Sequence, residues 1–412
     1  MRVSVRLVVL SLLTTALIAC LTACNLFNHS NITSSPSPYN PLPRVTMNYA
    51  VADTDNHRVL IYNTAFSTDE NASVVLGQAD FTSNALLPIA ANTFFYPASV
   101  TADASSNLYV ADYDNCRVLQ FKPPFTNGMN ASVVIGQPDF TTRSCAAGVS
   151  TLSGVTGVAI DGDGDLWVAD NSSRIVEFVP PFSNGMAASV VIGQASLSSS
   201  AGCNQSGSTT ASTLCEQWGI AFDSSGDLWV VDLGNSRVLE FKPPFSTGMS
   251  ASLELGQPSG ATALTSNTPN NGGLSATSLW YPAHPAFDGD GNLWVSDSGN
   301  NRVLEYVPPF SNGMAATLEL GQPSGASAFT SNASTTSQSG LNYPYGISFD
   351  TSGNIQVVDI DNSRVMIFAP PFSNGMNATK VFGQANFTSG SANQGGSVAA
   401  DTLYWPEGGV TF

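Results

Sequence analysis

The amino-acid sequence predicts an all-β fold, a six-bladed β-propeller, from three observations: a sixfold repeat, four strand-like segments per repeat, and complementary fragments at the two ends. Each repeat contains a Val-x-Asp segment and, four or five residues after the aspartate, an arginine. Successive aspartates stand 58 to 65 residues apart, a spacing typical of repeat architectures. The six pairs are Asp53/Arg58, Asp112/Arg117, Asp170/Arg174, Asp232/Arg237, Asp297/Arg302 and Asp359/Arg364.

The third repeat shows the composition of one unit. Apolar segments at 157–161, 165–170, 174–178 and 188–193 alternate with turn-forming residues such as Gly162-Asp163-Gly164. Short runs rich in Val, Ile, Phe and Trp, separated by Gly, Asn and Asp, predict an antiparallel meander. No segment of the repeats has a helical period long enough to compete. Four-stranded units repeated radially are the blades of a β-propeller.

The two ends of the sequence hold complementary fragments of one repeat. The segment from Asn48 aligns with the segment from Asn107, so the first repeat lacks its first strand. The last residues, 409–412, align with 157–160, which are a first strand. These fragments complete a sixth blade only if the ring closes, and closure removes the unpaired strand edges of an open array. We therefore expect 409–412 to pair with the strand that begins at Asn48.

The segment from Gly291 to Leu304, Gly-Asn-Leu-Trp-Val-Ser-Asp-Ser-Gly-Asn-Asn-Arg-Val-Leu, resembles an NHL repeat. The resemblance covers about residues 47–412 and implies a propeller. It says little about function, because NHL propellers serve as RNA readers, protein-binding modules, extracellular sensors and occasionally enzymes. In the third repeat Asp170 and Arg174 are one residue closer together than in the others, so we expect a different turn there. Gly-Gln pairs recur with the motif at 77–78, 136–137, 193–194, 256–257, 321–322 and 383–384.

The first 23 residues have the features of a bacterial export signal: two arginines, an apolar run from Leu7 to Ala19, and small residues before a cysteine. The apolar run is short for a membrane span. The segment Leu21-Thr22-Ala23-Cys24 resembles a lipobox, which implies that Cys24 is lipidated. Cys20 also fits the pattern, and an ordinary secretory signal is the alternative.

Three segments follow from this interpretation: a lipoprotein signal peptide at 1–23, a lipidated cysteine with a flexible tether at 24–46, and the propeller at 47–412. The tether is rich in Asn, Ser and Pro and has no periodicity. We therefore expect an exported protein of the bacterial cell envelope, attached to the membrane only through its lipid anchor.

The charge balance argues against a nucleic-acid partner. Without Arg2 and Arg6, 11 of the 13 basic residues remain against 30 acidic ones, a formal net charge of −19. Six of these 11 are the repeat arginines. Binding to DNA or RNA needs a basic patch that neutralises phosphates, and the sequence offers none.

Four cysteines remain after the signal segment. Cys203 and Cys215 fall in one long loop, whereas Cys116 and Cys145 fall in a turn and in the next loop between blades. In a propeller these turns and loops share a face, so both pairings are geometrically possible. An even number of cysteines in an exported protein predicts disulfides, here Cys116–Cys145 and Cys203–Cys215. The alternative, a metal site or a catalytic thiol, needs histidine partners that the chain barely has.

Residues that recur in every repeat are interpreted as structural. An aspartate and an arginine at the two ends of a tight turn can bond to each other and to the turn's backbone, and a catalytic site is normally unique. Regular placement before each fourth strand favours packing between blades for the phenylalanines of five Pro-Pro-Phe triplets. These are Phe125, Phe182, Phe245, Phe310 and Phe372.

The sequence gives no catalytic residue, no metal ligand set and no cofactor. The segment 161–165 resembles the start of a calcium loop but has Ser172 where the bidentate glutamate belongs. His57 and His284 are the only histidines in the repeats, too few for the zinc site of NHL-type lyases. No serine nucleophile motif is present. We therefore expect a protein that is not an enzyme; the alternative is a lactonase-like or lyase-like propeller with a cation in its central channel.

The loops between blades differ from one another in length and sequence, and such loops on a rigid scaffold are where binding residues concentrate. Aromatic residues at the ends of these loops favour contact with a glycan or a peptide. The competing interpretation is that they wedge between blades. We expect a monomer that binds a protein or a glycan, first of all through its tryptophans. The candidates are Trp218, Trp280, Tyr281, Tyr343, Tyr345, Tyr404 and Trp405.

Overall fold

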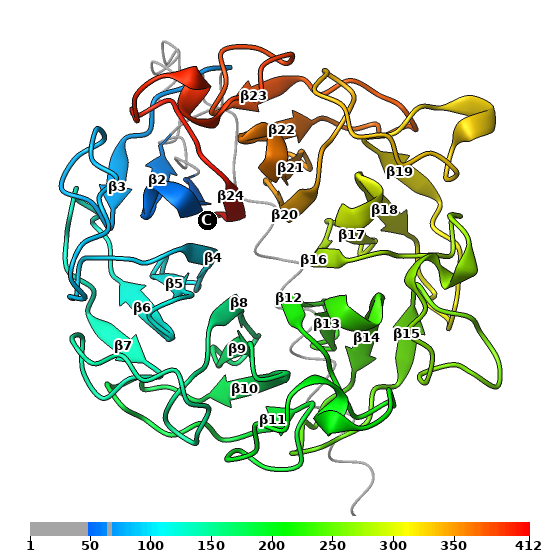
Figure 1. Ribbon diagram of the computed structural model, residues 1–412, viewed down its shortest axis with the longest axis horizontal. Helices are drawn as coiled ribbons and strands as arrows, with labels where there is room; N and C mark the ends of the chain where they lie inside the picture. Colours follow the sequence, from blue (N-terminus) through cyan, green and yellow to red (C-terminus); the bar gives the residue numbers. More distant parts are fainter. Residues whose placement is uncertain (1–47, 64–67) are drawn as a thin grey trace, which may run out of the picture. The chain divides into compact units, whose positions relative to one another are not determined.

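The computed structural model describes residues 48–63 and 68–412. These residues form six four-stranded antiparallel sheets arranged as a ring, which confirms the predicted six-bladed propeller (Figure 1). Within the described part of the chain, no helix is long and apolar enough to cross a membrane. The predicted signal peptide, the lipidated Cys24 and the tether lie outside the described residues.

Each blade runs from an inner strand at the centre of the ring to an outer strand at its edge (Figure 1). The strands of the six blades are, in this order, β24 (Pro406–Thr411), β1 (Tyr49–Asp53), β2 (Arg58–Tyr62) and β3 (Val74–Leu76); β4 (Pro97–Ala102), β5 (Leu108–Asp112), β6 (Arg117–Phe121) and β7 (Val133–Ile135); β8 (Val155–Ile160), β9 (Leu166–Asp170), β10 (Arg174–Phe178) and β11 (Val191–Ile192); β12 (Gln217–Phe222), β13 (Leu228–Asp232), β14 (Arg237–Phe241) and β15 (Leu253–Leu255); β16 (Pro282–Phe287), β17 (Leu293–Asp297), β18 (Arg302–Tyr306) and β19 (Leu318–Leu320); β20 (Pro344–Phe349), β21 (Ile355–Asp359), β22 (Arg364–Phe368) and β23 (Lys380–Phe382).

Short 3-10 helices occur in two places. Four follow the second strand of a blade: η1 (Thr54–Asn56), η3 (Leu233–Asn235), η5 (Ser298–Asn300) and η7 (Ile360–Asn362). Four lie in the loops between blades: η2 (Cys203–Ser206), η4 (Pro269–Gly272), η6 (Gly325–Ser327) and η8 (Ala392–Gly395). The second and third blades have a turn without such a helix at this place, so the shorter Asp–Arg spacing of the third blade does not by itself account for its absence.

The hydrophobic core is divided among the boundaries between blades. In β9, Leu166 and Val168 pack with residues of the second blade, whereas Trp167 and Ala169 pack with residues of the fourth. Successive side chains of a strand point to opposite faces, so a strand whose two faces are both covered is buried at every position and apolar except where a charge is paired, as Asp170 is with Arg174. All five residues of β9 are accordingly buried.

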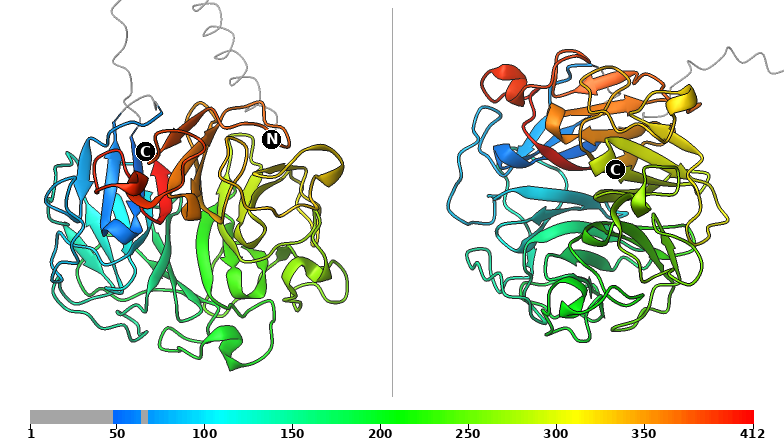
Figure 2. Two further views of the ribbon diagram at one scale, coloured as in Figure 1. Left: turned by 45° about the horizontal axis from the view of Figure 1, so that its top comes forward. Right: turned by 45° about the vertical axis from the view of Figure 1, so that its right-hand side comes forward.

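The C-terminal strand closes the ring. Residues of β24 pair antiparallel with β1, Tyr49 facing Thr411 and Val51 facing Gly409. The amide N–H of Asn48 donates to the carbonyl of Phe412 at 3.0 Å, and the Phe412 N–H donates back at 2.9 Å. In Figures 1 and 2 the red C-terminal strand lies beside the blue strands of the first blade. The predicted closure is confirmed, with the strand beginning at Pro406, three residues earlier than expected.

Both predicted disulfides are present. Cys116 is bonded to Cys145 with Cα atoms 5.3 Å apart, and Cys203 to Cys215 with Cα atoms 4.2 Å apart. The first ties the turn between β5 and β6 to the loop that follows the second blade. The second closes the loop before β12. Both lie on the face of the ring that carries the loops between blades.

The Pro-Pro-Phe phenylalanines pack between blades, as predicted, although each ring is only partly buried. Phe245 of the fourth blade meets Trp167 of the third with ring centroids 4.7 Å apart, edge to face. Phe310 meets Trp229, and Phe372 meets Trp294, at 4.9 Å in the same geometry. These contacts are the favoured T-shaped arrangement of aromatic pairs.

Candidate binding site at the channel mouth

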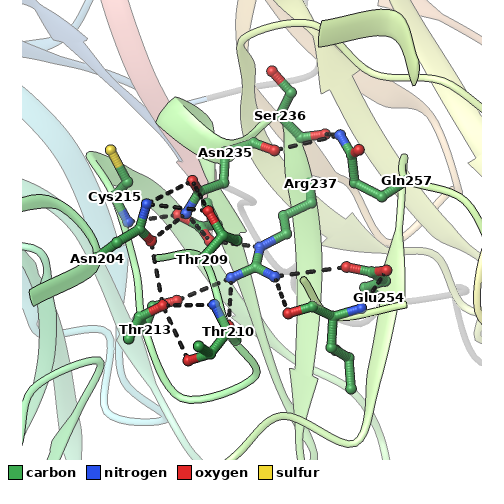
Figure 3. Close-up of polar contacts among 12 residues, drawn as sticks. Asn204, Thr209, Thr210, Thr213, Cys215, Asn235, Ser236, Arg237, Glu254 and Gln257 are labelled. Atoms are coloured by element: carbon green, nitrogen blue, oxygen red, sulfur yellow. Dashed lines mark hydrogen bonds and ion pairs between the residues drawn. The ribbon is translucent and has the colours of Figure 1, made fainter. Parts of the chain in front are cut away.

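The repeat arginine joins the loops on the two sides of its blade. In the fourth blade, the Arg237 Nε donates to Asp232 Oδ2 at 2.8 Å. Its Nη2 donates to the carbonyls of Thr210 and Thr213, each at 2.9 Å, and its Nη1 donates to the carbonyl of Leu264 at 3.0 Å. Figure 3 shows the guanidinium at the centre of these contacts. One side chain thus fixes the loop before the blade and the loop after it.

The repeat aspartate also has a structural role, because both oxygens of its carboxylate accept hydrogen bonds. Asp232 accepts hydrogen bonds from the Cys215 N–H at 2.7 Å and from the Asn235 side chain at 2.8 Å, besides the bond from Arg237. Burial raises the pKa of this carboxyl group, and the arginine charge and the donated hydrogen bonds oppose that rise. Asp232 and Arg237 are fully buried, so they have no surface to offer a ligand.

The glutamine of the Gly-Gln pair completes this frame. Gln257 donates from Nε2 to the carbonyl of Ser236 at 2.9 Å (Figure 3). It also donates to the carbonyl of Thr268 at 3.1 Å, so it bridges the turn and the loop between blades. The preceding Gly256 has φ of +90°, and a Cβ there would stand 2.5 Å from the Leu279 side chain. A glycine is therefore required at this position.

The rim of the ring on this face is formed by residues that directly precede the inner strands. Each has a left-handed backbone, which non-glycine residues adopt only where the surroundings enforce it. The kink directs the side chain out of the blade, and four of the five are exposed. These residues, with φ between 47° and 58°, are Tyr96, Glu216, Tyr281, Tyr343 and Trp405.

The second residue of each inner strand faces its counterparts around the ring, because the first residue pairs with the repeat aspartate in every blade. Three of these positions hold the large residues Glu407, Trp218 and Tyr345. The Trp218 ring lies 5.3 Å from Tyr345 and 6.2 Å from Tyr113, measured between centroids. The small residues Ala98, Thr156 and Ala283 hold the other three positions and leave room for the large ones.

A cavity of about 310 Å³ opens at this mouth of the channel. It is bounded by the start of β24, the turns that follow β1 and β5, the start of β12, and the residue before β4. Its walls combine four aromatic rings with three carboxyl groups, and none of the described Lys, Arg or His residues lines it. The lining residues are Thr54, Asp55, Tyr96, Tyr113, Asp114, Trp218, Trp405 and Glu407.

The carboxyl group of Glu407 has no basic partner. Among the described residues, none donates a hydrogen bond to its side chain or forms an ion pair with it. Burial raises the pKa of Glu407 to about 8, and the charge of Asp55 adds to the rise. Burial also raises the pKa of Asp55, while a hydrogen bond from the Tyr404 side chain lowers it. An electron-rich, aromatic-walled cavity of this kind can hold polar or cationic groups.

The seven predicted aromatic residues are distributed unevenly around this cavity. Trp218 and Trp405 line it, Tyr345 packs on Trp218 from below, and Tyr404 bonds to Asp55. Tyr343 does not line the cavity but stacks on Tyr345, with ring centroids 5.9 Å apart. Trp280 and Tyr281 do not line it; they contact each other at 5.8 Å.

Three lining carboxylates, Asp55, Asp114 and Glu407, and the tyrosine Tyr113 were not among the residues predicted from sequence. For Glu407 a signal exists, because Pro406-Glu407 aligns with Pro344-Tyr345 and Pro282-Ala283 at the start of inner strands. Asp55 and Asp114 occupy equivalent positions, two residues after their repeat aspartates, but that alignment does not show that they share a cavity with Glu407. Only the ring brings the turns after β1 and β5 next to β24 and β12.

The opposite face carries larger but repeated hollows. Cavities of about 510 to 590 Å³ lie between the first and second, second and third, and fourth and fifth blades. Each is lined by a hairpin turn of one or both blades and by the Pro-Pro-Phe segment of the later blade. Because equivalent residues form all three, we assign them to the joints of the scaffold. The channel mouth is smaller, but it combines Trp218 and Glu407, which no other blade carries at that position, with rim and turn residues of the first two blades.

One acidic group with metal-ligand spacing lies on that opposite face. Oxygens of Asp161, Asp165 and Glu177 lie within 4.8 Å of one another. Asp161 accepts the Asp165 N–H at 2.9 Å and the indole N–H of Trp167 at 2.9 Å, as a carboxylate that fixes a hairpin turn does. In the fourth blade the equivalent turn is neutralised by Lys242, a position held in the third by Val179.

Comparison with known proteins agrees with the repeat architecture of the six-bladed ring. Residues 214–241, from the end of a loop through β14, match the NHL repeat family. No curated protein sequence matches the chain. Among solved structures, a streptogramin B lyase is 15% identical with a TM-score of 0.40, over 70% of this chain and 68% of that one.

Two further structures are similar. A virginiamycin B lyase from Staphylococcus aureus is 14% identical, with a TM-score of 0.38, over 67% of this chain and 70% of that one. A protein of unknown function from Bacteroides caccae is 9% identical, with a TM-score of 0.49, over 89% and 99%. These likenesses carry no argument about activity. The matched repeat, seen together with the closed six-bladed ring, places this chain among the NHL-repeat β-propellers.

Proposed function

We propose that this protein is a non-catalytic binding module that takes its partner, a protein or a glycan, at the channel mouth. One observation carries the proposal. The residues shared by all blades are used to hold loops, whereas residues found once in the ring, among them Trp218, Trp405 and Glu407, meet around a single cavity. Repeat folds acquire a specific binding site when their rigid scaffold displays residues that differ from blade to blade at one place.

The runner-up is a lactonase-like or lyase-like enzyme with a cation in the channel. Asp55, Asp114 and Glu407 supply oxygen atoms of the type that hard cations prefer. Among the described residues, however, the only three acidic groups whose ligand atoms converge within 4.8 Å are Asp161, Asp165 and Glu177, on the other face. Carboxyl groups spread around an aromatic wall fit a larger ligand better than one metal ion.

The cellular setting of the proposal follows from the sequence. We propose that the module is monomeric, exported to the bacterial cell envelope and anchored through a lipid on Cys24. Two disulfides support an oxidising compartment. Mass spectrometry of the mature N-terminus tests this step, and an unlipidated N-terminus at a residue other than cysteine would rule out the anchor.

The binding site itself is tested by substitution at the rim. Envelope proteins and glycans are screened with the full-length protein, and Trp405→Ala and Trp218→Ala are compared with Tyr281→Ala. Tyr281 is a matched control, because it is 42% exposed like Trp405, has the same backbone kink and lies outside the cavity. We expect both tryptophan variants to lose binding and the control to keep it. A partner that binds all three folded variants normally would place the site elsewhere.

A further inference from the structure

We infer that the group received at the channel mouth is an organic cation, an alkylammonium group of the kind carried by choline or by a lysine side chain. This inference rests on the proposed function and specifies the ligand of the same site. It depends on three features of the cavity: its charge, its aromatic walls and the state of one carboxyl group.

The charge of the cavity is of one sign. Asp55, Asp114 and Glu407 line it, and no basic residue of 48–63 or 68–412 does. Arg143 lies over the Phe95 ring at 5.4 Å, next to the rim residue Tyr96. Arg143 is not part of the wall, so the like charges inside are not compensated by the protein. A cationic ligand supplies the missing charge, and a neutral sugar does not.

The aromatic walls supply the second feature. Tyr96, Tyr113, Trp218 and Trp405 come from four separate places in the chain and face one cavity. The negative faces of such rings attract ammonium groups, and several rings around one space are the usual receptor for a quaternary ammonium. The volume of about 310 Å³ leaves room for a trimethylammonium head and part of its chain.

Glu407 provides the third feature. It stands at the base of the cavity beside Asp55, Tyr113 and Tyr345, and none of these neutralises it. Glu407 is half-buried and lacks a basic partner among the described residues, a setting that disfavours the charged form and raises its pKa to about 8. A bound cation favours the ionised form. Ligand binding should therefore release the Glu407 proton, and affinity should rise as the pH increases toward about 8.

Of the other titrating groups around Glu407, Asp55 also has a pKa raised by burial, and a Glu407→Gln variant separates its contribution; the phenols and His57 do not reproduce the dependence. Burial raises the pKa of Tyr113 and of Tyr345, so both phenols stay neutral throughout that range. Burial also lowers the pKa of His57, which packs against Tyr96 at 4.9 Å outside the cavity. A quaternary ammonium ligand does not titrate, so the dependence reports on the protein alone.

The test is calorimetric titration of the full chain with choline and with the neutral alcohol in which carbon replaces the ammonium nitrogen. We expect choline to bind at least about tenfold more tightly than this alcohol. Glu407→Gln should weaken choline binding about tenfold and remove the rise with pH, while binding of the alcohol changes little. Because Glu407 lies in the ring-closing strand, Asp114→Asn is a second variant that should weaken choline binding without touching that strand.

A second arm identifies the source of the ammonium group. A peptide with a free lysine is compared with the same peptide acetylated at that lysine; preference for the free form points to a protein partner. Equal binding of choline and the alcohol, or unchanged choline affinity in both carboxyl variants, would overturn the inference. The proposed function fails separately, if a partner is found whose binding does not depend on Trp218 or Trp405.

Discussion

The repeat turns and the channel mouth lie on the same face of the propeller. They differ in whether their carboxyl groups are paired with a basic residue. Each repeat aspartate is buried against an arginine and bonded to the backbone of a neighbouring loop, as Asp232 is to Arg237 and Cys215. At the channel mouth Asp55, Asp114 and Glu407 form no ion pair with any of the described residues. The comparison teaches that the aspartates paired with arginine in every blade hold the scaffold, whereas the carboxyl groups at the mouth, of which Glu407 occurs once, are left for a ligand.

Removing residues 406–412 should have the largest effect, because it deletes the inner strand of one blade and opens the ring. The edge of β1 then loses its partner and the core beneath it meets solvent. Unpaired edges promote association between molecules. We expect aggregation on size-exclusion chromatography or a large fall in the melting temperature. A truncated protein as stable as the parent would mean that the ring does not depend on this closure.

Arg237→Ala tests the repeated side of the comparison. It removes the ion pair and leaves Asp232 and three loop carbonyls buried without their donor. Breaking a buried pair in this way costs about 3–5 kcal/mol of unfolding free energy. Lys242→Ala is the control, since that lysine is 55% exposed and its pairs are worth less than about 1 kcal/mol. Similar losses for the two variants in urea unfolding would refute the structural role.

The disulfides connect the two regions, because Asp114 lies two residues before Cys116 and Trp218 three residues after Cys215. By chain entropy, separations of 29 and 12 residues correspond to roughly 3.6 and 2.8 kcal/mol of stability. We expect Cys116→Ala with Cys145→Ala to lower the unfolding free energy by about 3 kcal/mol, and to weaken binding at the mouth through a less ordered wall. Peptide mapping that finds four free thiols would contradict both bridges.

The smallest effect concerns the opposite face. Burial, together with the charges of Asp161 and Glu177, raises the pKa of Asp165 to about 6. A carboxyl group whose pKa is raised on folding favours the native state below pH 4 and loses that contribution as the pH rises through 6. Val179→Lys should place an ammonium where Lys242 stands in the fourth blade. We expect a gain of less than about 1 kcal/mol at pH 7 and a flatter pH profile between 4 and 6. An unchanged profile would show that the third blade does not need a cation.

The fold could be predicted from the sequence because each blade repeats the same local rule. The Asp–Arg spacing locates every second and third strand, and the fragments at Asn48 and Gly409 require closure. The site could be predicted only in part. Trp218 and Trp405 were found as aromatics at the ends of loops, but the same pattern also selected Trp280 and Tyr281, which point elsewhere.

The carboxylates of the cavity could not be predicted from the sequence for a physical reason. Asp55 and Glu407 are 352 residues apart and meet only because the last strand returns to the first blade. Spacing along the chain carries no trace of such a contact. Where the repeats are in register, as at Pro406-Glu407, alignment of the inner strands does reveal which side chain enters the channel.

The most direct test of the central claim is the number of protons released when choline binds near pH 7, measured by calorimetry in buffers of different ionisation enthalpy. If the unrepeated carboxyl group of Glu407 is held ready for a cation, wild-type protein should release close to one proton per choline bound. Folded Glu407→Gln should release almost none, and Tyr281→Ala should behave like the wild type. Choline binding without proton release in the wild type, or with equal release in Glu407→Gln, would contradict the account.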